Sequence, residues 1–468
     1  MKPMKLKIAF SAVLLGSLAI GCSRSPEKPA AIYSQLLLRF HDVLAYAQPE
    51  KARVTNVSLD LTADFNAKKI SGTARLAIQR AANVDTVILD TRDLDIKSVK
   101  DAKGNPLGFN LGAADPILGA PLSVALPQSG DTIVVDYSSS PNAAAVQWLS
   151  AAQTAGGKLP FLFTQGEAIL TRTWVPTQDG PGIRQTYDAT IHVPAGMRAV
   201  MSAEHVGIEG EKDGKGLSVF RFRMTHPIPP YLIAIAVGDI AFRPIGKTTG
   251  VYAEPAVVDK AAAEFSEVDK MVAAAEKLYG PYRWGRYDIL VLPPSFPYGG
   301  MENPTLTFAT PTVLAGDKSL VSLVAHELAH SWSGNLVTNA TWNDFWLNEG
   351  FTTYIESRIM EELRGKDYAD MLRLLGRQTL ADEIAAKGAQ SPDTRLQIDL
   401  TGRDPDDGMG DIAYEKGAAF LQTFESVVGR DRLDKFLRGY FDHFTFQPMS
   451  SDRMAAYMKQ TLLTPEEE

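Results

Sequence analysis

Residues 321–356 read VSLVAHELAHSWSGNLVTNATWNDFWLNEGFTTYIE, and within them His326 to His330 form an HExxH motif. Two histidines four residues apart project from the same face of a helix, so they can bind one metal ion together. Asp317 or Ser319 is suited to cap the start of this helix. The motif therefore predicts a metal site on a helix in this stretch.

Two glutamates complete the predicted site. Glu327 directly follows the first histidine and is placed to act as a general base on metal-activated water rather than as a ligand. Glu349 comes nineteen residues after His330, at the start of a second helix expected over 351–363. Its carboxylate would close a His2Glu set, as in a zinc hydrolase, whereas Asp344 lies in the aromatic turn before that helix. The plain alternative is a helix that happens to present two histidines and a solvated glutamate.

Four separated motifs make the chain resemble a known family. HELAHSW and WLNEGFTTYIE are preceded by PSFPYGGMENPTLTF and followed by YEKG. This series is similar to the gluzincin zinc aminopeptidases, the family of aminopeptidase N, and most of all to its leukotriene A hydrolase branch, whose members are also aminopeptidases. The likeness extends from about residue 54 to 463. It implies an α+β chain, with a β-rich, saddle-like N-terminal domain followed by a thermolysin-like, mainly helical catalytic domain that holds one zinc ion.

The resemblance also implies which side chains act on the substrate. Tyr414 would donate a hydrogen bond to the developing oxyanion, and Glu302 of the GGMEN segment would hold the free amine of a peptide. The substrate-binding residues that the family motifs imply are Gln165, Glu167, Gly299, Gly300, Met301, Glu302, Asn303 and Asp406. Paired glycines suit this role because a backbone without Cβ atoms can approach a ligand closely. We therefore expect a zinc-dependent aminopeptidase that acts on peptides with a free amino terminus.

The first 22 residues have the pattern of a bacterial lipoprotein signal. Three lysines precede an apolar run over 8–18, and the small residues 19–21 (Ala-Ile-Gly) precede Cys22, the single cysteine of the chain. We expect a lipid anchor at Cys22 and a location at the bacterial cell envelope, facing an extracytoplasmic space such as the periplasm. An ordinary signal peptide with an incidental cysteine is the alternative.

Composition excludes other classes of function. Loss of the signal with its three lysines takes the formal net charge from −8 to −11. A mildly acidic chain without a basic run has no electrostatic footprint for nucleic acid. No other stretch is apolar over the length needed to span a bilayer. After the signal, about 445 residues with 45% hydrophobic composition overall are too many for one core, so we expect two or more domains.

Periodicity divides the chain after a tether at 23–47. Apolar residues alternate with polar ones at Val57, Leu59 and Leu61, and again over 74–78 and 220–224. This period of two predicts a β-rich domain over 48–244. From 245 to 468 the pattern is mainly helical, with a buried strand at 287–292. Helices are expected at 260–278, 351–363, 367–387, 416–428, 432–444 and 451–462.

The end of the chain raises a question of organisation, and the metal site leaves two alternative functions. Relatives in this branch usually continue into a helical C-terminal domain, whereas this sequence stops at Glu468, so it is either a fragment or an unusually short member. The alternatives to an aminopeptidase are an epoxide hydrolase with the same metal and a lipid-anchored peptide-binding protein that has lost catalysis. The retained HExxH motif, Glu349 and Tyr414 favour an enzyme, because a binding protein needs no such set.

Overall fold

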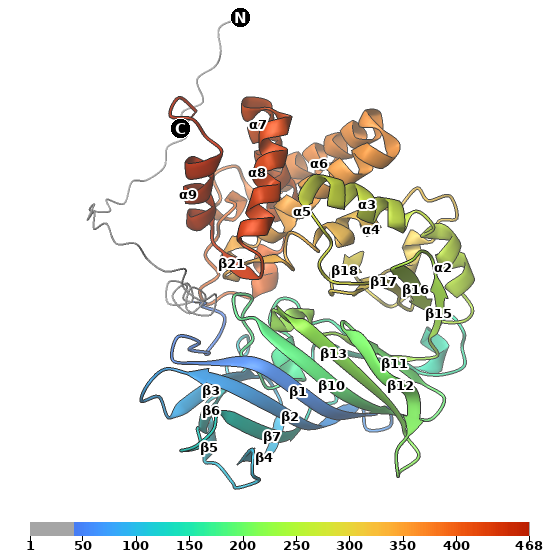
Figure 1. Ribbon diagram of the computed structural model, residues 1–468, viewed down its shortest axis with the longest axis vertical. Helices are drawn as coiled ribbons and strands as arrows, with labels where there is room; N and C mark the ends of the chain where they lie inside the picture. Colours follow the sequence, from blue (N-terminus) through green and yellow to red (C-terminus); the bar gives the residue numbers. More distant parts are fainter. Residues whose placement is uncertain (1–41, 468) are drawn as a thin grey trace, which may run out of the picture.

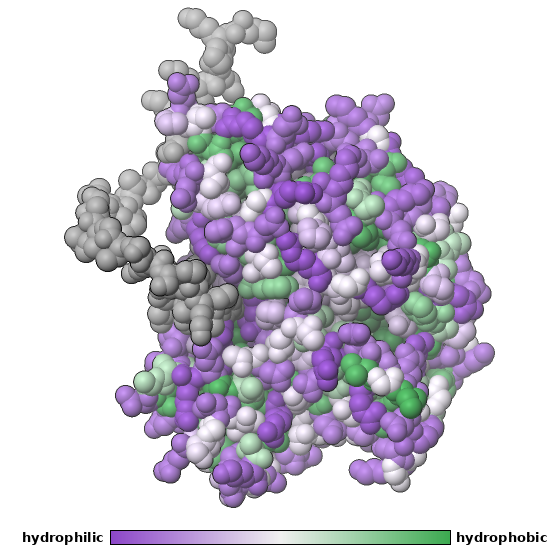
Figure 2. All heavy atoms as spheres, in the orientation of Figure 1, coloured by the Kyte–Doolittle hydropathy of each residue, from purple (hydrophilic) through white to green (hydrophobic). Residues whose placement is uncertain are grey.

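The computed structural model describes residues 42–467. The signal, Cys22 and most of the expected tether lie outside these residues. The described chain forms a β-rich part, drawn below in Figure 1, and a mainly helical part above it. On the face shown in Figure 2, hydrophobic residues are scattered among hydrophilic ones and form no continuous band. No helix within residues 42–467 is long and apolar enough to cross a membrane.

The β-rich domain is built on a seven-stranded sheet. Its spatial order is β12 (Glu204–Lys212), β13 (Ser218–Ile228), β10 (Gln185–Val193), β1 (Ala52–Asp64), β2 (Lys69–Arg80), β7 (Thr132–Ser138) and β4 (Asp95–Asp101). β1 and β10 run parallel, and the other neighbours are antiparallel. Val57, Leu59 and Leu61 of β1 are at most 3% exposed. The alternation predicted from the sequence is therefore confirmed, since it places these side chains in the core.

Two smaller sheets complete this domain. One has the order β3 (Thr86–Thr91), β6 (Ala120–Ala125) and β5 (Phe109–Leu111), and the other β11 (Arg198–Met201), β14 (Ile235–Gly238), β9 (Phe161–Thr164) and β8 (Val146–Leu149). All four residues of β9 are buried. Between residues 42 and 257 the described chain contains no α-helix, only short 3-10 turns. β9 positions the segment that follows it, which includes Gln165 and Glu167.

The second domain combines one sheet with a group of helices. Its five-stranded sheet has the order β15 (Ala241–Pro244), β16 (Thr249–Ala253), β17 (Tyr287–Val291), β19 (Leu306–Ala309) and β18 (Gly300–Met301). β16, β17 and β19 are parallel, and β18 runs antiparallel to β19 at the edge. β20 (Val337–Asn339) pairs with β21 (Gln447–Met449). The helices are α2 (Val258–Glu264), α3 (Val268–Tyr279), α4 (Ser322–Ala329), α5 (Trp346–Arg364), α6 (Lys366–Lys387), α7 (Gly417–Val428), α8 (Arg430–His443) and α9 (Ser451–Thr461).

Two local predictions are wrong. The single helix expected over 260–278 is two helices, α2 and α3, and at the break the hydroxyl of Ser266 donates to the Ala263 carbonyl at 2.9 Å. A serine that bonds locally in this way competes with the helical backbone ladder. Neither Asp317 nor Ser319 caps α4, because Val321 occupies the cap position without a side-chain bond and the Asp317 carboxylate accepts from the Ser319 N–H instead.

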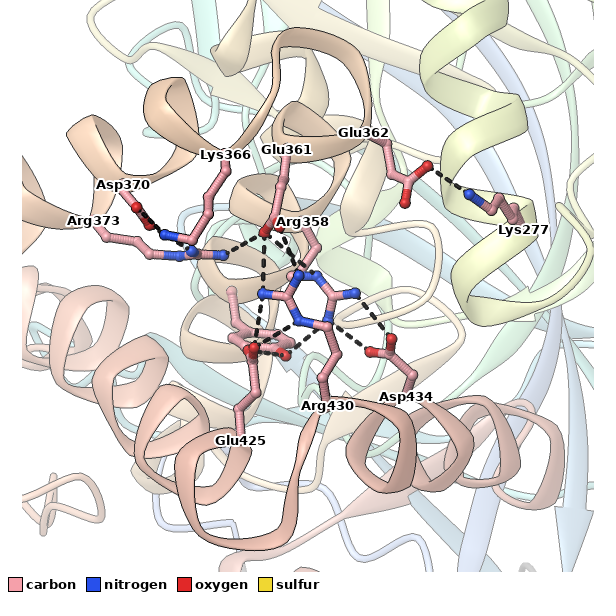
Figure 3. Close-up of polar contacts among 11 residues, drawn as sticks. Lys277, Arg358, Glu361, Glu362, Lys366, Asp370, Arg373, Glu425, Arg430 and Asp434 are labelled. Carbon is pink, nitrogen blue, oxygen red and sulfur yellow. Dashed lines mark hydrogen bonds and ion pairs between the residues drawn. The ribbon is translucent and has the colours of Figure 1, made fainter.

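Helix α5 is held by ion pairs to the helices around it (Figure 3). Arg358 is 3% exposed and reaches Asp434 of α8 at 2.6 Å, while Arg430 of α8 reaches Glu361 of α5 at 2.6 Å. Arg373 of α6 lies 3.0 Å from the same Glu361. Paired and hydrogen-bonded charges such as these fix geometry, because losing one partner leaves the other buried and unpaired. The network therefore fixes helix α5, which carries Glu349 in its first turn.

The two domains meet through buried contacts. Arg184, at the start of β10, is 3% exposed and donates to the Thr338 hydroxyl and the Asn335 carbonyl of the second domain. A Cβ on Gly182 would lie 2.6 Å from the Ala340 carbonyl oxygen, so the backbones approach too closely for any larger residue. This junction brings side chains from both domains to one cavity.

Candidate active site

A cavity of about 600 Å³ contains the HExxH residues and receives side chains from both domains. Gln165 and Glu167 enter it from the β-rich domain, and the remaining walls come from the helical domain. The predicted site residues along its wall are Gln165, Glu167, Gly299, Gly300, Met301, Glu302, His326, Glu327, His330, Glu349, Asp406 and Tyr414. Gln165 and Tyr414, which are 249 positions apart in the sequence, therefore converge on one site.

The three expected metal ligands lie within reach of one ion. His326 is on α4, His330 follows the end of α4, and Glu349 is in the first turn of α5. Their ligand atoms all lie within 4.8 Å of one another, with the Glu349 carboxylate 3.1 Å from His326 Nε2 and 3.5 Å from His330 Nε2. Asp344 is directed elsewhere, since its carboxylate accepts from the Ser451 hydroxyl at 2.6 Å and the Gln397 amide at 2.9 Å.

Hydrogen bonds at the far ring nitrogens orient both histidines. Nδ1 of His326 lies 3.1 Å from Glu356, and Nδ1 of His330 lies 2.8 Å from the Asn348 amide oxygen. Burial lowers the pKa of His330 to about 4, so this imidazole is neutral, as a metal ligand must be. With Nδ1 bonded, each Nε2 is directed toward Glu349. Two histidine nitrogens, one carboxylate and such supporting bonds suit a catalytic zinc ion, which leaves a fourth position open.

Glu327 lies beside this set and is 5% exposed. Burial raises the pKa of its carboxyl well above the ordinary value, and the charges of Glu302 and Glu349 act in the same direction. A Cβ on Gly300 would lie 2.2 Å from Glu327 Oε1. The absence of a side chain at Gly300 is therefore what allows strand β18 to run against this carboxylate.

Three carboxylates form a second group next to the histidines. Oxygens of Glu167, Glu302 and Glu349 lie within 4.8 Å of one another. Glu302 accepts from the Tyr231 hydroxyl at 3.2 Å. Burial raises the pKa of Glu167 well above its ordinary value, and the charges of Glu302 and Glu349 raise it further. So much negative charge at one place is costly unless cations are present, so the site suits a metal ion together with a ligand ammonium group.

Tyr414 reaches the same space from a π-helical turn over Ile412–Lys416 that directly precedes α7. Its ring stacks at 20° to the His326 ring, with the centroids 6.0 Å apart. Helices α5 and α7 approach closely just after this turn, where a Cβ on Gly350 would lie 2.5 Å from Gly417 Cα. Burial, then the charge of Glu349, raises the pKa of the Tyr414 phenol well above its ordinary value, so it keeps its proton and can donate a hydrogen bond.

The remaining predicted site residues differ in where they lie relative to the cavity. Asp406 is on the cavity wall, and burial raises the pKa of its carboxyl. Asn303 is 2% exposed and does not line the cavity; its carbonyl accepts from the Leu306 N–H at 3.1 Å and closes the turn between β18 and β19. Cys22 lies outside the described residues.

Sequence reasoning missed several residues that orient the site. Glu356 was a missed partner of His326, although it lies seven residues, or two helical turns, after Glu349 on the same face of α5. Asn348 was missed as the partner of His330, although it directly precedes Glu349. Tyr231, the partner of Glu302, comes from the β-rich domain and had no signal in the sequence.

Comparisons with known proteins agree with this geometry. The model of the Peptidase M1 N-terminal domain matches residues 48–232, and the model of the Peptidase family M1 domain matches residues 264–465. Leukotriene A-4 hydrolase of Xenopus laevis is 41% identical to this chain, over 89% of this chain and 70% of the relative. Aminopeptidase B of Mus musculus is 40% identical, over 89% of this chain and 67% of the relative. Leucine aminopeptidase 2 of Yarrowia lipolytica is 40% identical, over 86% of this chain and 62% of the relative.

Solved structures agree at the level of the fold. Yeast LTA4 hydrolase in complex with bestatin superposes with a TM-score of 0.85 at 35% sequence identity. The superposition covers 94% of this chain and 67% of the yeast chain. An M1 zinc metallopeptidase of Deinococcus radiodurans superposes with a TM-score of 0.73 at 21% identity, over 91% of this chain and 96% of its own. This second likeness concerns the fold alone.

The chain belongs to the Peptidase M1 family. It is thus a zinc metallopeptidase of the gluzincin group, and its relatives place it in the branch of leukotriene A-4 hydrolase and the aminopeptidases. The chain spans between 62% and 70% of the length of these curated relatives.

Proposed function

We propose that this chain is an aminopeptidase that hydrolyses the first peptide bond of peptides with a free amino terminus. The observation that supports this most is the group of three carboxylates, Glu167, Glu302 and Glu349, beside the two histidines. A substrate ammonium group is the natural counter-charge for the two acids that do not bind the metal. Binding the amine there sets the distance from the amino end to the reacting carbonyl.

The placement of each group supports the following catalytic roles. His326, His330 and Glu349 would hold a zinc ion, which would supply a Lewis acid to polarise the scissile carbonyl and to acidify a water molecule. Glu327 accepts a proton from the attacking water and returns it to the leaving amine. Tyr414 donates a hydrogen bond to the carbonyl oxygen as negative charge develops on it.

Substrate binding uses the backbone of β18 as well as the acids. Gly299, Gly300 and Met301 present an edge to the cavity, because β18 pairs on one side with β19 and is the last strand of its sheet. A peptide that adds to such an edge forms main-chain hydrogen bonds without regard to its side chains. Gln165 and Asp406 line the same cavity and would contact the first residue of the substrate.

Two alternatives need separate assays. An epoxide hydrolase reaction is suggested by the name of the relative leukotriene A-4 hydrolase, and turnover of an allylic epoxide fatty acid would reveal it. A peptide-binding protein without catalysis is less consistent with the site, since Glu327 and Tyr414 have no role in binding alone. Zinc content measured together with turnover separates this case from an enzyme.

The test of the proposed function is a panel of aminoacyl-arylamides and their N-acetylated forms. We expect hydrolysis of the free-amine forms only, and the same panel identifies the preferred first residue. In Glu302→Ala the difference between free and acetylated forms should become smaller, because the site no longer recognises the charge. Zinc-loaded protein that hydrolyses neither form would refute the proposal.

We further propose that the chain is anchored by a lipid at Cys22 and faces an extracytoplasmic space of a bacterial envelope. The pattern of residues 1–22 supports this proposal. Cys22→Ser should abolish incorporation of labelled fatty acid and shift the protein from the membrane to the soluble fraction. If both forms fractionate as soluble protein, the segment is an ordinary signal peptide.

A further inference from the structure

We propose that Asn348 and Tyr231 are positioning residues, which hold Glu302 in the orientation in which it binds the free amine of a substrate. The inference rests on the proposed function, because it concerns the amine that Glu302 would bind. Asn348 is 0% exposed, Tyr231 1% and Glu302 3%. Asn348 is in the first turn of α5, Tyr231 is in a short 3-10 turn between β13 and β14, and Glu302 directly follows β18. Three separate parts of the chain therefore meet at one buried polar group.

Two hydrogen bonds hold the same carboxylate oxygen of Glu302. The Tyr231 hydroxyl donates to Glu302 Oε1 at 3.2 Å, and Asn348 Nδ2 donates to the same oxygen at 3.4 Å. Asn348 Nδ2 also donates to the Tyr231 hydroxyl oxygen at 3.3 Å, so the three side chains are bonded in a closed ring. Burial, then the charge of Glu302, raises the pKa of the Tyr231 phenol well above its ordinary value, so the phenol keeps the proton that it donates.

The other end of the Asn348 amide contacts an expected metal ligand. Asn348 Oδ1 lies 2.8 Å from Nδ1 of His330. An imidazole that binds a metal through Nε2 carries its proton on Nδ1, which then needs an acceptor. The reversed amide would place its donor against this N–H and its oxygen against the Glu302 carboxylate, so only one orientation satisfies both neighbours. The contact with His330 thus fixes the donor end of Asn348 toward Glu302.

The orientation of Glu302 matters because this carboxylate lies near two kinds of partner. Its ligand atoms are within 4.8 Å of those of Glu327 and His330, and also of those of Glu167 and Glu349. A carboxylate in this place could turn toward a metal ion instead of an ammonium group. The bonds to Oε1 oppose that rotation, and they reduce the side-chain entropy that Glu302 loses when it binds an amine.

The backbone of Glu302 is held by a different residue. The side-chain amide of Asn335 donates to the Glu302 carbonyl at 2.7 Å. Loss of the bonds from Asn348 or Tyr231 would therefore free the side-chain torsions of Glu302 and leave its backbone in place. The expected result is weaker recognition of the amine rather than loss of the site.

Two hydroxamates that differ only in an ammonium group test the inference. L-leucine hydroxamate carries the α-ammonium group, and 4-methylpentanehydroxamic acid lacks it, while both bind zinc through the hydroxamate. Calorimetric titration of the full zinc-loaded chain with each compound gives the ratio of the two affinities. We expect the wild type to bind the amino form about 100-fold more tightly, because only this form gains hydrogen bonds to charged carboxylates.

Replacement of either positioning residue should lower this ratio. Tyr231→Phe should reduce it about 10-fold and leave the affinity for the form without an amine unchanged, because the expected metal ligands keep their bonds. Asn348→Ala should reduce the ratio by a similar factor and also weaken zinc binding about 10-fold, since His330 Nδ1 keeps only its other neighbours, such as the Ser333 carbonyl at 3.2 Å. In Glu302→Ala the ratio should fall close to one, and adding Tyr231→Phe should not change it further.

The matched controls each remove a buried polar group outside the catalytic cavity. Tyr187 is 1% exposed and its phenol bonds to the Ser202 hydroxyl at 2.9 Å, while Asn339 is 0% exposed and its amide donates to the Thr341 carbonyl at 3.0 Å. Neither residue lines the cavity. Tyr187→Phe and Asn339→Ala should therefore keep the wild-type ratio, even where the melting temperature falls.

The outcomes separate this inference from the proposed function. A wild-type ratio in Tyr231→Phe or in Asn348→Ala would overturn the role of that residue, and an equal loss of affinity for both hydroxamates would show a merely structural effect. Equal affinity of the wild-type chain for the two hydroxamates would instead refute amine recognition at Glu302, and with it the proposed function. Zinc content measured before each titration shows that the compared chains carry the same metal load.

Discussion

Replacing Gly300 by alanine tests whether the contact between β18 and Glu327 positions this residue, the proposed general base. The added Cβ would lie 2.2 Å from Glu327 Oε1, 2.4 Å from Cδ and 2.7 Å from Cγ. Because an ordinary contact begins at 3.4 Å, the carboxylate must move by about 1.2 Å. Misplacement of a reacting group by about 1 Å costs roughly 10²-fold in rate, and loss of a general base costs roughly 10²–10⁴-fold.

We therefore expect Gly300→Ala to lower kcat by at least about 10²-fold, or about 2.7 kcal/mol of transition-state stabilisation. Zinc content should stay at the wild-type level, because the clash involves neither histidine nor Glu349. The free energy of unfolding should change little, since a side chain rather than backbone must move. The measurements are kcat on an aminoacyl-arylamide, bound zinc, and a denaturant titration.

A double variant identifies the cause. If the methyl group acts through Glu327, Gly300→Ala combined with Glu327→Gln should be no slower than Glu327→Gln alone, because both changes disable one group. Gly214→Ala, which adds a methyl group in open space, controls for the loss of a glycine. Wild-type kcat in Gly300→Ala, or fully additive effects in the double variant, would refute the reasoning.

Four further predictions concern the metal, the substrate and stability. Glu349→Ala should lose zinc and activity together while Asp344→Asn keeps its zinc, and full zinc occupancy in Glu349→Ala would contradict the ligand assignment. N-acetylated peptides should resist cleavage unless Glu302 is replaced, and rapid cleavage of an internal bond in a blocked peptide would exclude an exopeptidase. Arg172→Met should lower the free energy of unfolding by about 3–5 kcal/mol, because it removes the ion-pair partner of the buried Asp179 carboxylate, which lies 3.1 Å from Arg172 Nε. A loss below about 1 kcal/mol in a urea titration would contradict this. Burial raises the pKa of Asp42 from 3.8 to about 6, so its contribution to stability is complete below pH 4 and is lost as the pH rises through 6. Asp42→Asn should accordingly stabilise the chain by up to about 3 kcal/mol at pH 8 but not at pH 4, and an equal gain at both values would show another cause.

The grouping of His326, His330 and Glu349 at one place was predictable because their spacing is local. The separation of His326 from His330 is one helical turn, and the chain returns with Glu349 after a short connection. The strand alternation at Val57, Leu59 and Leu61 is local in the same sense, and the structure buries all three side chains. Features encoded within one element or between two neighbouring elements were therefore open to sequence reasoning.

Contacts between distant elements were not predictable from sequence. The approach of Gly300 to Glu327 depends on how an edge strand packs on α4, and the bond from Tyr231 to Glu302 joins the two domains. The hydrophobic periodicity of the sequence predicts neither contact. The break between α2 and α3 was missed for a different reason, since the apolar spacing continues through it and only the local bond of Ser266 interrupts the helix.

The junction at Arg184 and Gly182 has a consequence for the biosynthesis of the enzyme. The residues that could hold a metal ion are on the second domain, whereas Glu167 and the Tyr231 hydroxyl that bonds to Glu302 come from the first domain. A chain whose second domain had folded before the first docked on it would hold the two histidines and Glu349 together but would lack a complete pocket for an amino end. Under the proposed function, peptidase competence reports completed assembly, and an immature molecule is unable to trim the exposed amino ends of its neighbours.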